Sequence, residues 1–303
     1  MPALRSHFGL FGVVYEVTVR ILKSQPLRIN YEITHIDPFK ANFAKNVHAL
    51  RTSYDQVFGM LFPDSGTLLW QCRKFLDPSA PKPNPIEKLI DKVESKGINI
   101  YKDFLLSLVK AGTELHPARP LAELLNKSLI EVPIRLMAHS VYTIDPGDRA
   151  ITWDEGNPPF EFYDWVFPEE KWVEMVQAFL KLAGRFRDEH DFTFPIPTLI
   201  YYINKDEASL LSRSRGGNMI TVDPQYTDPN DATWKKFRLA FNEIAILHGG
   251  IPHINKTRDG AINHFAKQQD QTSVKKYLEL RKKIDPNGLF LNDYFRTLYK
   301  GYL

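Results

Sequence analysis

The sequence contains a single cysteine, Cys72, among its 303 residues. One thiol cannot form a disulfide within the chain, and it cannot supply a zinc site that needs two thiolates. Long apolar runs are also missing, because no stretch reaches the roughly 20 apolar residues of a membrane-spanning helix. The N-terminus lacks a signal-peptide pattern, since Glu16 interrupts its apolar run. We therefore expect a soluble protein of a reducing, cytoplasmic compartment that makes no membrane contact.

An excess of charge of one sign is likewise missing. The chain has 39 Lys and Arg against 36 Asp and Glu, a formal net charge of +3. Nucleic-acid-binding domains usually carry a strong basic excess, so we expect no nucleic-acid partner. What the chain does have is aromatic residues, at 13%, within an ordinary hydrophobic fraction of 43%. This composition suits a globular protein with a large sheet and apolar pockets, although core packing alone would also explain it.

Period-two alternation with β-branched residues predicts strands, and 3.6-residue spacing predicts helices. The predicted strands cover 11–22, 27–36, 67–75, 134–144, 160–167, 198–203 and 218–222. The predicted helices cover 38–54, 86–96, 100–111, 120–127, a segment that opens at Pro168, 234–248 and 273–283. Strands and helices do not alternate in a regular βαβ rhythm. We therefore expect an α+β fold with a large, mainly antiparallel sheet flanked by helices.

Three segments, in this order, carry a resemblance to a known family. They are GLFGVVYEVTVRIL at 9–22, FEFYDWVFPEEKWVEMVQAF at 160–179 with its continuation to 212, and HGGIPHINK at 248–256 followed by RKKIDPNGLFLNDY at 281–294. Together they resemble the C-terminal half of FAD-linked oxidases of the vanillyl-alcohol-oxidase type. Within that family they are most similar to the sugar-1,4-lactone and alditol oxidases, and the resemblance runs over nearly the whole chain.

The resemblance implies a cap-type substrate domain and a particular division of the chain. Residues 1–23 would be a remnant of the flavin-domain strand, 24–260 the cap-like substrate domain, and 261–303 a C-terminal helix and tail. The family's flavin-binding half would fall before Met1, so that half is expected to be absent. Gly9 and Gly12 match family glycines that pass close to the flavin, and they would bind cofactor only if FAD binds. Without phosphate-binding loops we expect no cofactor.

The chain departs from the family pattern at two places. The family carries a Glu-x-Arg pair on a cap strand, where this sequence has either Leu199 and Tyr201 or Pro197 and Leu199, depending on the anchor. Such a pocket should prefer a more apolar substrate than a sugar. The family motif His-Trp-Gly-Lys is replaced by a segment that keeps the His and the Lys, from His253 to Lys256.

Three residues are candidate catalytic groups. Lys256 matches the family lysine beside the reacting end of the substrate, and could polarise a carbonyl or protonate an enolate. His253 is either a general acid–base group or a capped loop histidine. Tyr201 would donate a hydrogen bond to a ligand carbonyl, unless it serves only sheet packing.

Three further residues are candidate substrate contacts, namely Asn255, Leu199 and His139. His139 lies mid-strand in its predicted strand and faces either the core or the pocket. Arg213 and Arg215 precede a glycine pair and could grip an anionic group, but their sequence favours a solvated loop.

The leading functional hypothesis is a flavin-free, redox-neutral enzyme that isomerises, cyclises or eliminates from a carbonyl-bearing or polyene substrate of relatively apolar character. An alternative is an FAD-linked alcohol or lactone oxidase whose flavin-binding half is supplied elsewhere. A second alternative is a non-catalytic ligand-binding protein. No metal is expected. The expected partners are a small-molecule substrate and either a second copy of the chain or a separate flavin-binding chain.

Overall fold

The computed structural model describes residues 2–21, 27–35, 43–77, 79, 85, 141–143, 161–194 and 196–303. The helices predicted at 86–96, 100–111 and 120–127 lie outside these residues, as does His139 with most of its predicted strand. Across the described ranges, no helix is both long and apolar enough to cross a lipid bilayer.

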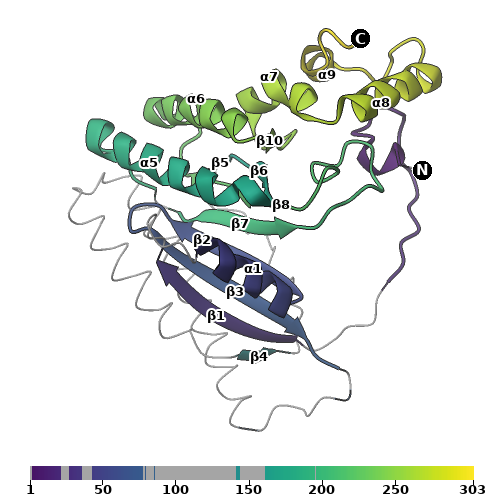
Figure 1. Cartoon of the computed structure of the whole chain (residues 1–303). Coiled ribbons are helices and arrows are strands. Elements are labelled where there is room, and N and C mark those ends of the chain that lie inside the picture. Colours follow the sequence, from purple (N-terminus) through teal and green to yellow (C-terminus); the bar gives the residue numbers. More distant parts are fainter. Residues whose placement is uncertain are drawn as a thin grey trace.

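An antiparallel sheet forms the centre of the described structure (Figure 1). Its eight strands have the order β10-β6-β8-β7-β2-β3-β1-β4, and every neighbouring pair is antiparallel. The strands are β1 (Leu27–His35), β2 (Gln56–Phe62), β3 (Thr67–Phe75), β4 (Val141–Thr143), β6 (Trp165–Pro168), β7 (Thr198–Ile203), β8 (Met219–Val222) and β10 (Ile251–Pro252). This architecture confirms the predicted α+β fold with a large, mainly antiparallel sheet.

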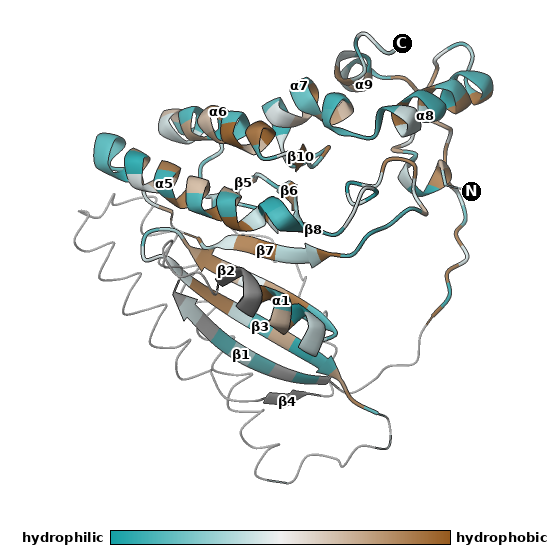
Figure 2. Ribbon diagram, in the orientation of Figure 1, coloured by the Kyte–Doolittle hydropathy of each residue, from teal (hydrophilic) through white to brown (hydrophobic). Residues whose placement is uncertain are grey.

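Helices flank the sheet, as the sequence predicted (Figure 1). They are α1 (Phe43–Ser53), α5 (Trp172–His190), α6 (Ala232–Leu247), α7 (Arg258–Gln268), α8 (Gln271–Ile284) and α9 (Asp293–Leu298), with short 3-10 turns at Leu4–Ser6 and Glu169–Lys171. Hydrophobic and hydrophilic stretches alternate along α5 and α8, as is typical of amphipathic helices (Figure 2). The buried face of α5 includes Trp172, Val176, Phe179 and Ala183, which recur at the spacing of three and four residues that such a helix requires.

The predicted strand 160–167 is interrupted. The chain forms β5 (Glu161–Phe162), which pairs with β9 (Gln225–Tyr226), and then β6, which pairs with β8 in the large sheet. The pairs β5–β9 and β6–β8 have the same register, so the two short ladders lie in line. Between them, the backbone N–H of Tyr163 donates to the carbonyl of Pro224 at 2.9 Å. Pro224 has no N–H to return, and this missing donor explains the gap between the two strands.

Two apolar clusters hold the described elements together. The larger one fills the space between the sheet and helices α5 and α6, and includes Trp165, Phe179 and Trp234. The smaller one joins helices α7, α8 and α9 to the N-terminal residues Leu10 and Phe11. The division of the chain into residues 1–23, 24–260 and 261–303 is not tested by these clusters and stays a prediction.

The strand predicted at 11–22 is wrong. Residues 12–21 have no regular secondary structure, although their sequence alternates as a strand should. A strand needs a neighbour for its backbone N–H and C=O groups, and none of the described strands pairs with this segment. The propensity of a sequence for extended backbone therefore does not by itself produce a strand here.

The turn after α6 is tightly packed around Gly250, and a substitution there tests this packing. A Cβ at this position would lie 2.6 Å from the Phe167 ring and 2.8 Å from the Ala245 carbonyl oxygen. We predict that Gly250→Ala lowers the free energy of unfolding by about 1–3 kcal/mol, because neighbouring groups must shift to admit the methyl group. Urea denaturation measures this change. At Gly216 a Cβ would meet nothing within 4 Å, so Gly216→Ala is the matched control; equal stability of both variants would contradict the prediction.

Candidate functional site

A row of side chains crosses four neighbouring strands at one end of the sheet. The register Trp165↔Val222, carried one residue further, sets Asp164 opposite Asp223. Asp223 in turn forms an isolated bridge with Leu199. On the other side of Asp164, the backbone N–H of His253 donates to the Asp164 carbonyl at 2.9 Å. Directly opposed residues of an antiparallel pair project to the same face, so these four side chains share one face of the sheet.

Lys256 and Asp223 form an ion pair at this row. The Lys256 Nζ atom lies 3.1 Å from Asp223 Oδ2, and also 4.6 Å from the centre of the Phe162 ring. The Asp223 side chain is fully buried, whereas 33% of the Lys256 side chain is exposed. Burial and the nearby Asp164 raise the pKa of Asp223 to about 7, against the opposing effect of Lys256. This carboxyl group can therefore both hold and release a proton near neutral pH.

A second ion pair, Arg213–Asp164, lies beside the first. Arg213 Nη2 is 3.0 Å from Asp164 Oδ2, and both side chains are largely buried. Asp164 Oδ1, Asp223 Oδ1 and Arg213 Nη1 are buried without a hydrogen-bond partner among the residues that the structure describes. Buried polar atoms in proteins are normally paired. Three such atoms in one place form a site with unmet capacity to bind a polar group.

Tyr201 and His253 complete the cluster, because both lie near the same acids as Lys256; the catalytic roles predicted for these three residues stay predictions. Burial and the negative charges of Asp223 and Asp164 raise the pKa of Tyr201 to about 12, so its phenol stays protonated. Burial and the neighbouring Arg213 lower the pKa of His253 to about 4. At neutral pH the Tyr201 hydroxyl is therefore a donor, and the His253 imidazole is neutral, a hydrogen-bond acceptor and only a weak base.

The predicted substrate contacts have mixed placements. Leu199 lies in the row, next to Asp223. Asn255 is exposed and lines a shallow cavity of about 230 Å³ with Lys256, Phe162 and Arg258. His139 lies outside the described residues, so its predicted role stays a prediction.

The structure places two acids in the site that sequence reasoning missed, and one arginine that it assigned elsewhere. Asp164 and Asp223 were not singled out, although an acid within the apolar run FEFYDWVF was a usable signal. The sequence predicts a solvated loop around Arg213. This prediction is wrong, because the loop between β7 and β8 folds Arg213 against Asp164, where its charge is neutralised.

Gly9 and Gly12 adopt positive φ angles of +78° and +138°, and a Cβ at either position would meet nothing within 4 Å. These two glycines are therefore required by backbone conformation and not by close packing.

Comparison with known proteins gives two matches in sequence. Residues 153–298 match the family model of D-arabinono-1,4-lactone oxidase. Mouse L-gulonolactone oxidase is 27% identical over 144 residues, which cover 45% of this chain and 30% of that protein. The resemblance to the sugar-lactone oxidases is confirmed for the C-terminal part of the chain. Both matched proteins are named for lactone oxidation, and the whole candidate cluster lies within the matched segment.

Solved structures agree with the fold. Cholesterol oxidase from Brevibacterium sterolicum superposes with a TM-score of 0.54 at 11% identity, covering 90% of this chain and 59% of that chain. A solvent-stable cholesterol oxidase gives the same TM-score and identity, with 60% of that chain covered. At this level of identity the likeness concerns the fold alone. The chain thus spans about a third of its lactone-oxidase relative and about three fifths of its structural neighbours.

FAD is the cofactor that the lactone-oxidase family implies, so we tested whether the described residues fit its diphosphate. Helix N-termini bind phosphates when their backbone N–H groups are free. Here the N-termini of α6, α8 and α9 are capped by the side chains of Asp231, Asp270 and Asn292. Helices α5 and α7 carry the acids Glu174 and Asp259 in their first turns. These five helix N-termini therefore do not fit a diphosphate.

Metal binding has equally little support within the described part of the chain. None of its groups of His, Cys, Asp and Glu residues brings together three side chains placed to hold a metal ion. The chemistry of the site is thus that of its carboxylates, its two cations, the neutral imidazole and the phenol.

The raised pKa of Asp223 predicts a particular dependence of stability on pH. Folding raises this pKa from its ordinary value of about 3.9 to about 7, so the folded protein binds this proton more tightly than the unfolded chain. The contribution of Asp223 to stability is then full below about pH 4 and is lost as the pH rises towards about 7. We predict that Asp223→Asn removes this loss, so that stability declines less between about pH 4 and pH 7.

Urea denaturation at a series of pH values measures this difference in slope. Asp293 has a fully exposed side chain, and Asp293→Asn is the control that should follow the unmodified protein. The same slope in the Asp223 variant and the unmodified protein would contradict the assignment.

Proposed function

We propose that this chain supplies the substrate-binding and acid–base part of an FAD-linked enzyme that oxidises a lactone or alcohol. The observation that carries the proposal is the Lys256–Asp223 pair, in which a half-buried cation holds a fully buried carboxylate with a pKa of about 7. The pair lies with His253 and Tyr201 in the segment that matches D-arabinono-1,4-lactone oxidase.

The polar end of the substrate would bind at this pair. The Lys256 ammonium and the Tyr201 hydroxyl donate hydrogen bonds to a hydroxyl or carbonyl oxygen. The unpartnered Oδ1 atoms of Asp164 and Asp223 accept hydrogen bonds from substrate hydroxyl groups. Asp223, in its ionised form, accepts the proton that leaves a hydroxyl group, and the neutral His253 accepts a hydrogen bond from the substrate. Each of these tasks requires only side chains of this chain.

The apolar part of the substrate would extend along the same face of the sheet. Leu199 is opposite Met60, and Tyr201 is opposite Phe58, with the two rings 5.1 Å apart. These four side chains are all partly exposed. A substrate with one polar end and an apolar remainder would satisfy both halves of the surface. The prediction of a relatively apolar substrate therefore applies only to the part of the substrate that would lie along these four side chains.

The flavin-binding part of the proposed enzyme lies outside the described residues. The match to L-gulonolactone oxidase covers 30% of that protein, and the helix N-termini described above do not fit a diphosphate. When residues outside the described part bind it, FAD would accept the electrons that leave the substrate.

A redox-neutral, flavin-free reaction is the second candidate function, and the composition of the site favours it. A proton acceptor near neutral pH, a protonated phenol and a cation suffice to move a proton at the carbon next to a carbonyl group. Isomerisation or elimination on a carbonyl-bearing substrate would then need no group beyond those described.

Lys256→Met tests the role of the lysine in binding. A hydrogen bond to a charged group contributes about 1.5–3 kcal/mol, so we predict roughly tenfold or greater weakening of substrate binding. Sugar-1,4-lactones, polyols and apolar primary alcohols and ketones are titrated against the 303-residue chain, with binding followed by ligand-observed NMR. Lys236 is exposed on α6, and Lys236→Met is the matched control. Equal binding by both variants, or no binding of any compound to the unmodified chain, would count against the proposed site.

Two activity readouts separate the candidate functions. Hydrogen peroxide production in air by the chain combined with a flavin-binding polypeptide and FAD, lost in Lys256→Met, supports the oxidase. Exchange of substrate C–H for deuterium in D2O without FAD, lost in the same variant, supports the redox-neutral reaction. Binding that depends on Lys256 with neither activity would instead support the ligand-binding alternative.

A further inference from the structure

Glu161 is a buried acid that the proposed function does not use. Its side chain is 5% exposed and belongs to β5, three residues before Asp164. Trp234 Nε1 donates to its Oε2 atom at 2.6 Å, and Arg238 Nη1 donates to both carboxylate oxygens, at 2.8 and 3.0 Å. Arg258 Nε lies 2.6 Å from its Oε1 atom. A buried carboxylate is stable only where such donors surround it, so Glu161 joins β5 to both α6 and α7.

The anchor that Glu161 forms is rigid. Its backbone pairs with Tyr226 in the β5–β9 ladder. Trp234 and Arg238, the two donors from α6, are 0% and 3% exposed. Side chains packed this closely keep one rotamer. The Arg258 side chain, in contrast, is 55% exposed, so the buried acid sets the place of the exposed arginine and not the reverse.

Arg258 transmits this anchor to the candidate site through the backbone. It is the first residue of α7 and directly follows the loop from His253 to Thr257, which carries Lys256. The Asp164 carbonyl holds the same loop, since it accepts from the His253 N–H at 2.9 Å and from the Thr257 hydroxyl at 2.6 Å. Lys256 therefore lies between residues that are tied to β5 and to the start of β6.

Lys256 needs this support because its pairing with Asp223 is weak by itself. The lysine has a flexible four-carbon stem and is 33% exposed, so water competes for its ammonium group. With a pKa of about 7, Asp223 is uncharged in a large fraction of molecules at neutral pH, and its attraction for the lysine then falls. The Phe162 ring, 4.6 Å from Lys256 Nζ, belongs to the same strand as Glu161. Strand β5 thus contacts the lysine directly and fixes the loop that carries it.

We propose that Glu161 is a positioning residue, which holds Lys256 against Asp223 through the ion pair between Glu161 and Arg258. The proposal rests on the proposed function only in taking Lys256 and Asp223 as the functional pair. The acid has no part in the reaction: its carboxylate fixes Arg258, Arg258 fixes the loop, and the loop aims the lysine. Strand β5 is not part of the large sheet. Loss of the acid should therefore displace Lys256, while Asp164 and Asp223 keep their register.

The pKa of Asp223 reports the position of Lys256 without any substrate. Lys256 lowers this pKa against the effects of burial and of Asp164, so a displaced lysine leaves the pKa higher. A nearby opposite charge changes the pKa of an acid by roughly 1–3 pH units, which is the rise that Lys256→Met should give. Carbon-13 NMR of the aspartate carboxyl groups in the 303-residue chain follows the titration. The other charged or titratable groups of the site stay the same in every variant, namely Asp164, Tyr201, Arg213 and His253.

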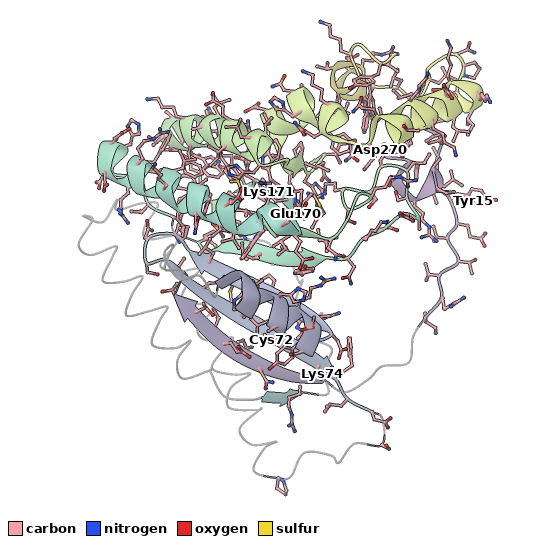
Figure 3. All side chains as sticks on the ribbon, viewed as in Figure 1. Tyr15, Cys72, Lys74, Glu170, Lys171 and Asp270 are labelled. Atoms are coloured by element: carbon pink, nitrogen blue, oxygen red, sulfur yellow. The ribbon has the colours of Figure 1, made fainter. Side chains whose placement is uncertain are left out.

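Glu161→Gln is the main test. Removing a negative charge by itself lowers the pKa of a neighbouring acid, so a positioning role and a purely electrostatic role predict opposite results. We predict that Glu161→Gln raises the pKa of Asp223 in the direction of Lys256→Met, and that it raises the pKa no further in the Lys256→Met background. Glu174 is the matched control, an exposed acid paired with Lys171, which is labelled in Figure 3. Glu174→Gln should leave the pKa of Asp223 unchanged.

A second variant gives the answer if Glu161→Gln does not fold, because a broken buried ion pair is strongly destabilising. Arg258→Met leaves Glu161 with its two donors from α6 and should also raise the pKa of Asp223. The same substitution in the Lys256→Met background should then have little effect, since Arg258 acts through the lysine. Arg296 on α9 is 54% exposed, and Arg296→Met is the control that should change nothing.

Two results would overturn the proposal. One is a pKa of Asp223 that is unchanged or lower in folded Glu161→Gln. The other is an equal rise from Arg258→Met with and without Lys256, which would mean that Arg258 acts by its own charge. Failure of the proposed function has a different signature. In that case no lactone, polyol, alcohol or ketone binds the unmodified chain, while the titrations of Asp223 still decide the role of Glu161.

Discussion

The antiparallel ladder that joins β10, β6, β8 and β7 is the constraint on which the candidate site depends. Its register sets Asp164 opposite Asp223 and brings His253 and Leu199 into the same row, from four parts of the chain. A shift of any one strand by a residue would turn its side chain to the other face. The aromatic core beneath the sheet, which includes Trp165 and Phe179, holds this register against slippage.

The two carboxylates impose a second constraint, because like charges on adjacent strands repel each other. Lys256 and Arg213 each neutralise one acid, and both come from loops and not from the sheet. The pKa of Asp223 is still raised, because its burial and the nearby Asp164 outweigh the effect of Lys256. A site of this kind is costly to the folded state, and proteins keep such sites where a proton must be moved. Burial is the main reason why His253 is neutral and Tyr201 stays protonated, and the charges of Arg213 and of the two acids, respectively, add to it.

The large sheet and the segment 12–21 show opposite outcomes of similar sequence patterns. Strand β3 at Thr67–Phe75 and strand β7 at Thr198–Ile203 follow the predicted boundaries, because each has a neighbour on both sides. Residues 12–21 alternate as clearly, yet they remain unpaired. The difference lies in available partners and not in propensity. The segment leads from the smaller apolar cluster at the C-terminal helices towards the large sheet, and none of the described strands pairs with it.

The sequence by itself determined the fold class, the helix that follows Pro168, and the strands β3 and β7. It also indicated Tyr201, His253 and Lys256 as candidate site residues, whose roles stay predictions. These features depend on local periodicity and on motifs of a few residues, which are readable without knowledge of distant contacts. Only the tertiary structure decided that Asp164 and Asp223 face each other, that Arg213 folds inward, and that 12–21 forms no strand. Each of these outcomes depends on which strand or loop lies alongside, and pairing between segments far apart in the chain leaves no signal in either segment alone.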